Sequence, residues 1–326
     1  MSEPARPSKV EKFHGVLILD KPRGPTSHDV VARLRRVLGN KEIGHAGTLD
    51  PMATGVLVVC VGEATKLSPW LTAADKAYEA TIALGAETDS LDAEGTVTRR
   101  AEVPTSMREA LERIKSGKIH DHVARAIAHE RERTSQVPPA VSAIKKDGVP
   151  SYERARKGIA VELEPRPVSV RALDVLDGGA DPDGHGAWLA VRCDVSKGYY
   201  VRALARDLAA SLGTLGHLTA LRRTRSGPFE LEEAMPLDTP ADELSARFLA
   251  LDRAASRALP ALRLTETGVR DARFGRPVRR EDLGEGVVAG PHAWLDGSGH
   301  LVAVGELAED GATGRVLRGF APAPSP

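Results

Sequence analysis

Residues 44–51 read GHAGTLDP, and residues 52–67 continue as MATGVLVVCVGEATKL. The first string is a glycine-rich loop that carries His45 and Asp50, and the apolar run over residues 55–61 predicts a buried strand. The glycines let the backbone approach a ligand closely, and the proline stiffens the exit of the loop. A carboxylate in this place can be a nucleophile, a general base, a metal ligand or a turn former. By residue type alone, an aspartate before proline in a loop favours the turn.

The patterning around this loop predicts both strands and helices. Residues 15–20 (GVLILD) form a short apolar run typical of a buried strand, and a helix is expected from about Thr26, with Ser27 as its cap and Gly39 as its end. Further strands are expected over residues 76–84 and 188–195, and further helices over residues 106–133 and 201–212. These elements do not follow a regular βαβ order, so the expected fold class is α+β.

The C-terminal part of the chain has a different pattern. A connecting helix is expected between residues 236 and 260, and the short apolar runs from Ala261 onward are broken by glycine and proline, which predicts a compact β-rich module. The expected domains are therefore a flexible tail at 1–12, a catalytic domain at 13–255 and a C-terminal domain at 258–320.

The composition is that of an ordinary globular protein, with 326 residues, 28% of them charged, and a formal net charge of zero. Basic residues concentrate in residues 190–227, where seven lysines and arginines stand against two aspartates. The two cysteines are too few for a disulfide framework, and the first fifteen residues are polar, without an apolar signal core. We therefore expect a cytoplasmic protein without a membrane span.

Five further strings lie on both sides of the GHAGTLDP loop. They are GVLILDKPRGPTSHDVV, DKAYEATIALGAETDSLDAEG, VPPAVSAIKKDGVPSYERARKG, CDVSKGYYVRALARDLAASLG and HLTALRRTRSGPF. Together with the loop, and in the same order along the chain, they resemble the TruB family of pseudouridine synthases. The resemblance covers most of residues 13–229.

This resemblance implies a fold and an activity. The fold is a pseudouridine synthase catalytic domain, with a mixed, mostly antiparallel sheet and flanking helices, followed by a small PUA-like RNA-binding domain. The activity is conversion of the T-loop uridine at tRNA position 55 to pseudouridine after the base is flipped out of the stack. The partner is then the T-arm of tRNA, and the protein acts as a monomer with no cofactor, no metal and no obligate protein partner.

The same resemblance assigns the reacting groups. Asp50 is the nucleophile, and its target is either ribose C1′ or uracil C6, because a covalent intermediate splits a difficult exchange into two steps. Tyr78, in the DKxY string, stacks on the flipped uracil and takes part in proton transfer through its hydroxyl. His45 stacks against RNA near the extruded nucleotide.

Other site residues follow from the SKGxYxR and LRR strings. Tyr200 and Arg202 match the first, and an arginine beside Asp50 would keep that carboxylate ionised and oriented. Leu221 matches a position near the bound base, although core packing is the default role of a leucine. Contacts with the RNA backbone are expected from five basic residues, namely Lys21, Lys145, Arg222, Arg223 and Arg225.

Two alternatives stay open at this point. One is a carboxylate-dependent nucleosidase or glycosidase, which would need a second carboxylate beside Asp50. The other is a T-arm RNA-binding protein or RNA chaperone that grips the RNA without chemistry. Residues 116–134 also add charged sequence that the shorter family pattern lacks, and the role of this insertion stays open.

Overall fold

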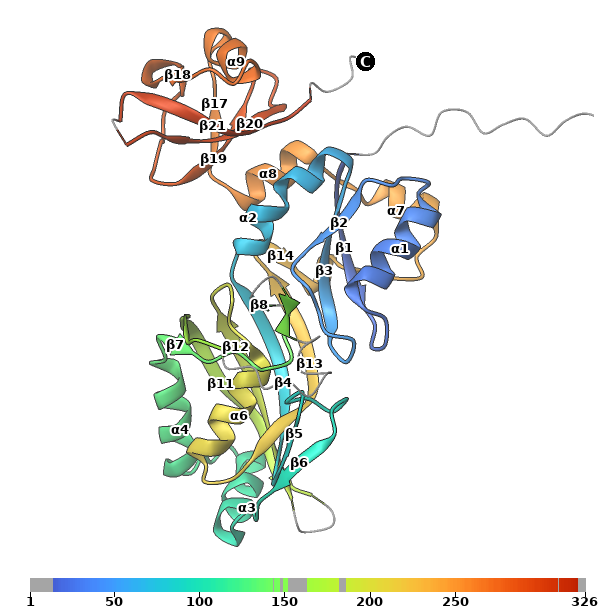
Figure 1. The fold of residues 1–326 in the computed structure, drawn as a ribbon, viewed down its shortest axis with the longest axis vertical. Coiled ribbons are helices and arrows are strands. Elements are labelled where there is room, and N and C mark those ends of the chain that lie inside the picture. The colour runs from blue at the N-terminus through green and yellow to red at the C-terminus, as the bar shows by residue number, and fades with distance from the viewer. Residues whose placement is uncertain are drawn as a thin grey trace, which may run out of the picture.

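The computed structural model describes residues 14–142, 144–146, 149–151, 163–181, 186–309 and 311–321. The molecule is elongated, with the C-terminal strands at one end of the long axis and α3 (Thr105–Glu112) at the other (Figure 1). One large sheet occupies most of the length between these ends (Figure 1).

The large sheet is mixed and mostly antiparallel, as expected. Its order is β11-β12-β4-β13-β3-β1-β15, with β2, β14 and β16 paired at the side. Only the pairs β13–β3 and β1–β15 are parallel among its described neighbours. The strands are β1 (Gly15–Lys21), β2 (Ile43–Ala46), β3 (Thr54–Val61), β4 (Lys76–Leu84), β11 (Val170–Ala180), β12 (Ala187–Val195), β13 (Gly216–Ser226), β14 (Phe229–Glu230), β15 (Met235–Pro236) and β16 (Leu249–Ala250).

Strand β3 separates two hydrophobic cores, which explains why its sequence is apolar throughout. Successive side chains of a strand point to opposite faces. Leu57 and Val59 therefore enter one core, together with residues of α1 (Ser27–Val37), whereas Val56 and Val58 enter the other. A strand that is covered on both faces reads as a continuous apolar run and not as an alternating one.

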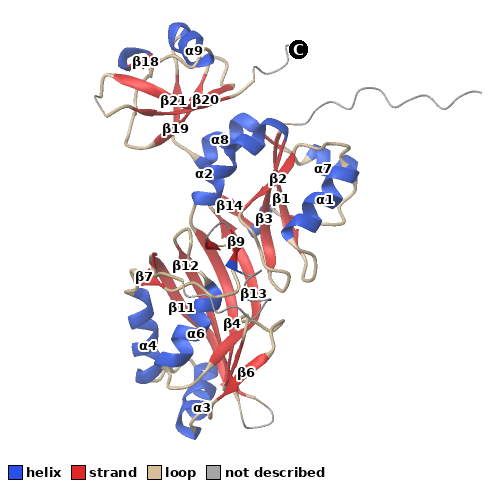
Figure 2. Cartoon of the chain, viewed as in Figure 1, coloured by secondary structure: helices blue, strands red, loops and turns tan. Residues whose placement is uncertain are grey.

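Helices cover one face of the sheet at the β11, β12 and β4 end, as Figure 2 shows for α3, α4 and α6. Besides α1 and α3, the described helices before the C-terminal sheet are α2 (Ser68–Ala73), α4 (Asp121–Arg131), α6 (Val201–Ser211), α7 (Ala241–Ala246) and α8 (Leu251–Ala258). Three 3-10 turns lie at η1 (Gly62–Leu67), η2 (Arg113–Ser116) and η3 (Leu231–Glu233). Three small ribbons pair β5 (Ala86–Thr88) with β6 (Val97–Arg100), β7 (Ser135–Gln136) with β10 (Arg166–Pro167), and β8 (Lys145–Lys146) with β9 (Val149–Pro150).

None of the helices in the described ranges is long and apolar enough to cross a membrane.

Three expectations about helices were wrong in detail. Ser27 does not cap α1: the cap is Thr26, which forms a capping box with Asp29. The helix expected over 106–133 is divided into α3 and α4, because Gly117 takes a left-handed conformation with φ of 76° and ends η2. The single connecting helix expected over 236–260 is instead two short helices, α7 and α8.

The C-terminal part forms a five-stranded sheet of its own, which confirms the expected β-rich unit. Its order is β17-β19-β20-β21-β18, and the fully buried Trp294 sits in its core. The elements are β17 (Ala261–Arg263), α9 (Glu266–Arg273), β18 (Val278–Arg279), η4 (Arg280–Asp282), β19 (Pro291–Leu295), β20 (Leu301–Leu307) and β21 (Thr313–Gly319).

This C-terminal unit packs firmly on α8. Ala254 and Ala255 of α8 share a core with Leu301 and Val304 of β20 and with Phe320. The same core continues into the large sheet through the residues of β3 that point away from α1. The apolar contact therefore makes the C-terminal unit continuous with the rest of the molecule.

Candidate active site

The GHAGTLDP string forms the end of β2 and the loop that leads to β3. Arg223 of β13 fixes this loop through hydrogen bonds to its backbone. The Arg223 guanidinium donates to the carbonyl oxygens of Gly47 (3.1 Å), Thr48 (3.4 Å) and Val56 (2.7 Å). Gly47 has a φ of 94°, and a Cβ there would lie 3.5 Å from Arg223 Nη1. The glycine is required because a side chain would be strained in this conformation.

A second buried cation, Lys21, holds the other side of the loop. Its Nζ donates to the carbonyl oxygens of Pro22 (2.9 Å), Pro25 (2.8 Å) and Pro51 (3.3 Å), and burial lowers its pKa. Ser27 adds a hydroxyl that bonds to both the N–H and the carbonyl oxygen of Leu49. The expected RNA backbone contact is wrong for Lys21 and Arg223, which are 0% and 1% exposed and bind protein carbonyls instead.

The loop presents Asp50 to Arg202, which lies in the first turn of α6. Arg202 Nε is 3.0 Å from Asp50 Oδ2, so the expected pairing of these two residues is present in the structure. The Asp50 side chain is 34% exposed, whereas that of Arg202 is 9% exposed. An ion pair with one half-exposed carboxylate orients that carboxylate without closing it off from a substrate.

Asp92 is a further member of this charge group that the sequence analysis did not single out. Its Oδ2 lies 3.6 Å from Arg202 Nη1, and the same nitrogen donates to the carbonyl oxygen of Ser90 at 2.9 Å. Leu91 between them has a φ of 62°, the one positive value among non-glycine residues in the described ranges. The available signal was the end of the DKAYEATIALGAETDSLDAEG string, which carries Asp92. Asp92 and Ser90 therefore fix the position of the Arg202 guanidinium, which in turn pairs with Asp50.

Tyr78 and Leu221 line the cavity beside Asp50, which has a volume of about 310 Å³. Both side chains are buried, that of Tyr78 on β4 and that of Leu221 on β13. Burial raises the pKa of Tyr78, although a hydrogen bond with Arg223 acts in the opposite direction. An aromatic ring and a leucine beside a carboxylate make a pocket that suits a flat heterocyclic base.

Lys76 lines the same cavity and was also missed. It is 8% exposed, and its Nζ donates to the carbonyl oxygens of Thr72 (2.9 Å) and Ala74 (2.6 Å). Burial, with the adjacent Arg223, lowers the pKa of Lys76 to about 8. Its position in a regularly alternating strand concealed it, because the pattern shows only that the side chain points inward.

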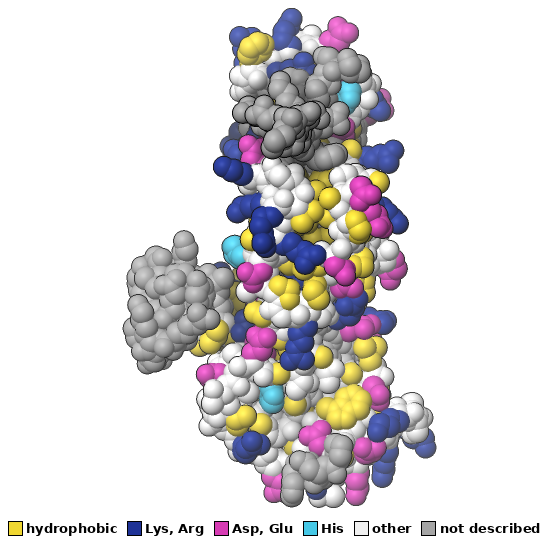
Figure 3. Space-filling view, turned by 90° about the vertical axis from the view of Figure 1, so that its right-hand side faces the viewer, with side chains coloured by type: hydrophobic (Ala, Val, Ile, Leu, Met, Phe, Trp, Pro, Cys, Tyr) yellow, Lys and Arg dark blue, Asp and Glu magenta, His cyan; other side chains and the backbone are white. Residues whose placement is uncertain are grey.

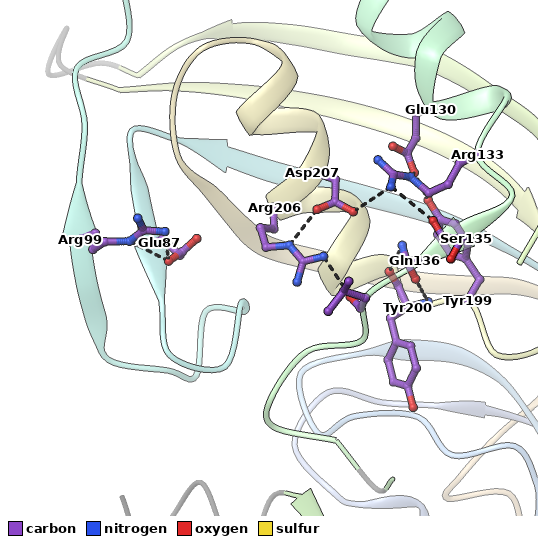
Figure 4. A network of polar contacts seen from close by, with 11 residues as sticks. Glu87, Arg99, Glu130, Arg133, Ser135, Gln136, Tyr199, Tyr200, Arg206 and Asp207 are labelled. Atoms are coloured by element: carbon purple, nitrogen blue, oxygen red, sulfur yellow. Dashed lines mark hydrogen bonds and ion pairs between the residues drawn. The ribbon is translucent and has the colours of Figure 1, made fainter. Parts of the chain in front are cut away.

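Tyr199 also lines the cavity, and Tyr200 lines it from the N-cap position of α6. Burial raises the pKa of its hydroxyl. In Figure 4 the Tyr200 ring projects away from the polar contacts around Glu130.

His45 lies on β2 and is not among the residues that line this cavity. Its ring packs edge-on against the exposed His28, with the ring centroids 5.3 Å apart. The His45 Nδ1 atom is buried without a hydrogen-bond partner in the described part of the chain, and burial lowers the pKa of the ring. The His28 and His45 rings therefore pack together beside the GHAGTLDP loop.

The remaining basic residues lie in ion pairs at the surface. Arg222 pairs with Asp20 at 2.7 Å and Arg225 with Asp194 at 2.5 Å. Lys145 lies on β8, and its side chain falls outside the described residues. Basic and acidic side chains are interspersed over the face shown in Figure 3, so the positive charge of this region is locally balanced.

No cluster of three or more histidine, cysteine or carboxylate side chains arranged to hold a metal ion occurs within the described ranges. Cys60 and Cys193 are buried in strands, and burial raises the pKa of each thiol to about 12. A thiol of this kind is a poor nucleophile. Neither thiol is among the residues that line the cavity, whereas Asp50 is.

Comparison with known proteins agrees with this geometry. The model of the TruB family pseudouridylate synthase N-terminal domain matches residues 35–201, and that of the tRNA pseudouridylate synthase B C-terminal domain matches residues 202–254. The chain is 45% identical over 302 residues to tRNA pseudouridine synthase B of Mycobacterium sp. (strain KMS), covering 91% of this chain and 92% of the relative. It is 46% identical over 306 residues to the protein of that name from Thermobifida fusca (strain YX), with the same coverage.

Solved structures extend the likeness to the fold. The chain superposes on one chain of a Cbf5-Nop10-Gar1 complex with a TM-score of 0.69 and 25% identity, covering 97% of this chain and 88% of that one. A chain of an H/ACA RNP bound to a substrate RNA containing 2′-deoxyuridine gives a TM-score of 0.66 with 23% identity, covering 98% and 93%. From the matched domains and the identity over nine-tenths of its length, the chain belongs to the TruB family of pseudouridylate synthases.

Proposed function

We propose that this protein is a tRNA pseudouridine synthase that isomerises the T-loop uridine at position 55, with Asp50 as nucleophile. The observation that carries the proposal is the Asp50 carboxylate held 3.0 Å from Arg202 at a cavity that Tyr78 and Leu221 also line. The cavity holds a carboxylate, a guanidinium and an aromatic ring within one small volume. These are the groups that a base-flipping isomerase without a cofactor needs.

The reaction exchanges one bond of the uracil for another. The N1–C1′ glycosidic bond breaks, the base turns, and a C5–C1′ bond forms, while a proton leaves C5 and N1 gains one. Asp50 bonds covalently to the uridine, at ribose C1′ or at uracil C6, and is released when the new carbon–carbon bond is complete. Nothing is added or lost, so the RNA keeps its mass.

The residues around Asp50 orient this carboxylate and bind the uracil. Arg202 orients Asp50, and Tyr78 stacks on the uracil. Because its pKa is raised, Tyr78 is a neutral phenol at pH 7, and its hydroxyl acts through hydrogen bonding and proton relay. Extruding the uridine costs roughly a few kcal/mol, which contacts in the cavity and at the vacated position offset.

The protein recognises the tRNA through its T-arm and acts in the cytoplasm as a monomer, without a protein partner or cofactor. Residues 13–255 carry the chemistry, and residues 258–320 extend the RNA contact toward the rest of the tRNA. Among the expected contacts with the RNA backbone, Arg222 and Arg225 are partly exposed and keep this role in the proposal. His45 stacks against RNA at the edge of the loop.

The test is incubation with an unmodified tRNA transcript, followed by mapping of pseudouridine at single-nucleotide resolution. We expect one modified position in the T-loop, no free uracil, and no product with Asp50→Asn. Release of free uracil would instead identify a nucleosidase. Tight tRNA binding without any product from the wild-type protein would identify an RNA-binding protein or chaperone.

A further inference from the structure

A buried polar network connects α4 to the start of α6, on the side of Tyr200 that faces away from the cavity (Figure 4). We call it the α4–α6 network and define it as Glu130, Arg133, Gln136, Tyr199 and Asp207. Of its members, only Tyr199 is among the residues that line the cavity. The contacts of the network nevertheless end on the segment that carries Tyr200 and Arg202.

Glu130 lies in the last turn of α4 and is 1% exposed. Its Oε1 accepts a hydrogen bond from the Tyr199 hydroxyl at 2.8 Å and another from Arg133 Nε at 2.5 Å. Burial and the adjacent carboxylate raise the pKa of Tyr199, so the phenol stays protonated and donates. Residue Tyr199, next to the cavity residue Tyr200, is thereby anchored to α4.

Arginine contacts extend the anchor along α6. Arg133 Nη1 lies 3.5 Å from Asp207 Oδ2, and Arg206 Nε donates to the other oxygen of Asp207 at 2.7 Å. Arg206 also donates to the carbonyl oxygen of Val137 at 2.9 Å. The segment from Arg133 to Val137 is thus tied to two successive residues of α6.

Gln136 makes the contact nearest to the chemistry. Its side-chain amide accepts from the Tyr200 N–H at 2.9 Å and donates to the Tyr200 carbonyl oxygen at 3.2 Å. Gln136 is 2% exposed, so water does not compete freely for these bonds. The two bonds fix the peptide groups on both sides of the Tyr200 Cα, and with them the direction in which the ring enters the cavity.

Stability alone does not account for this network. The Glu130 Oε2 atom is buried and has no hydrogen-bond partner in the described ranges, which is a cost for a carboxylate. Buried ionic groups are frequently no more stabilising than apolar residues of the same volume, and the best-attested reason to keep them is specificity of structure. What this network specifies is the position of the first turn of α6, where a misplacement of about 1 Å can cost about a hundredfold in rate.

We propose that Gln136, Glu130 and Tyr199 are positioning residues that hold Tyr200 and Arg202 against Asp50. This inference rests on the function proposed above. It also gives a role in the reaction to the end of the charged insertion, which carries Glu130 and Arg133, and to the segment that follows it up to Val137. The start of α6 packs against this part of the chain.

The test compares Gln136→Leu and Tyr199→Phe with wild type in single-turnover assays on the tRNA transcript. Leucine keeps the volume of Gln136 and removes both bonds to Tyr200, so we expect at least a tenfold lower rate constant. The dissociation constant for tRNA should change less than threefold. Tyr199→Phe removes only the hydroxyl, and a three- to tenfold loss is expected. A rate constant of Gln136→Leu equal to that of the wild-type protein would overturn the proposal.

A matched control lies on the same helix. Arg131 of α4 pairs with Asp174 of β11 at 2.8 Å, with both side chains about half exposed, and within the described residues its hydrogen bonds go to β11 and not to α6. Arg131→Ala should stay within twofold of the wild-type rate constant. An equal loss in this variant would mean that any disturbance of α4 slows the reaction, and would reject the specific role of the network.

A double variant separates positioning from general destabilisation. If Gln136 acts through α6, then Gln136→Leu added to Arg202→Lys should lower the rate constant less than threefold further, because the guanidinium it positions is already gone. Full additivity of the two losses would overturn the proposal. If instead the wild-type protein forms no pseudouridine at all, the proposed function fails, and that result is distinct from either outcome for the variants.

Discussion

Two groups of basic residues in this protein differ in their burial and in the partners of their side chains. The cavity floor, defined as Lys76 and Arg223, consists of two cations that are at most 8% exposed and that donate to backbone carbonyl oxygens. The C-terminal arginine group, defined as Arg270, Arg273 and Arg276 around the end of α9, is exposed. Two of its ion pairs are as long as 3.9 Å.

The difference shows that the basic residues of an RNA-modifying protein need not all serve RNA. A cation whose donors are saturated by carbonyl groups determines the shape of a loop, whereas an exposed cation with loose partners keeps its donors for phosphate groups. The floor therefore supports the chemistry, and the C-terminal group is the better candidate for contacts with the tRNA backbone. The four predictions below test this division.

The largest effect on activity is expected for a substitution of Asp50, which lines the same cavity as Lys76 and Arg223. Asp50→Asn keeps the shape of the side chain and removes its nucleophilic oxygen, so turnover should fall by at least roughly three orders of magnitude. The measurement is single-turnover formation of pseudouridine, together with the dissociation constant for tRNA, which should change little. More than trace activity in this variant would contradict the role of Asp50 as nucleophile.

The second prediction compares two neighbouring arginines of β13. Arg223→Met leaves three carbonyl groups, one buried and two partly buried, without their donor, so the free energy of unfolding should fall by about 3 kcal/mol. Arg222→Met breaks only the partly exposed pair with Asp20 and should cost less than about 1 kcal/mol. Urea denaturation of both variants measures the difference. Equal losses would mean that the floor has no special structural role.

The third prediction uses the pKa of Lys76, which is about 8 in the folded protein against a reference value of 10.5. The charged lysine is disfavoured in the folded state, and this cost is fully present below pH 8. Between pH 8 and 10.5 the unfolded chain binds more protons at this residue, so stability contributed by Lys76 rises with pH. Relative to Lys76→Met, the wild-type protein should gain about 2–3 kcal/mol across this interval.

The comparison is made on unfolding free energies of the two proteins in the same buffers, so that the other lysines and tyrosines cancel. A difference between wild type and Lys76→Met that does not depend on pH would show that Lys76 is not desolvated at the cavity floor.

The smallest effect is expected at the C-terminal arginine group. Replacing Arg270, Arg273 and Arg276 by glutamine should weaken binding to full-length tRNA about tenfold at low salt, and should flatten the plot of log affinity against log salt by roughly two. Binding to an isolated T-arm hairpin should not change, because the group lies on the C-terminal unit, far along the molecule from α6 (Figure 1). Loss of the same size on both RNAs would place these arginines at the T-arm.

Local pattern was a good guide where one factor decides the structure. The strand at Lys76–Leu84 has the bounds that its alternation predicts, and the stripe of Val201, Leu204 and Leu208 is buried on α6 as its spacing predicts. Local pattern failed where two signals compete. Ser27 and Thr26 are both capping residues, and the contact of Ser27 with Leu49, twenty-two residues later, leaves the cap to Thr26.

The sequence by itself determined the family, the α+β class and the presence of Asp50, Tyr78 and Arg202 at one site, because these follow from strings of adjacent residues. Only the tertiary structure decided what each basic residue does. Arg222 and Arg223 are neighbours of the same type, and a strand turns one toward Asp20 and the other under the catalytic loop. The same holds for Asp92, Gln136 and Glu130, whose partners come from distant segments of the chain. Burial and partner choice depend on the packing of distant segments, and no window of sequence contains them.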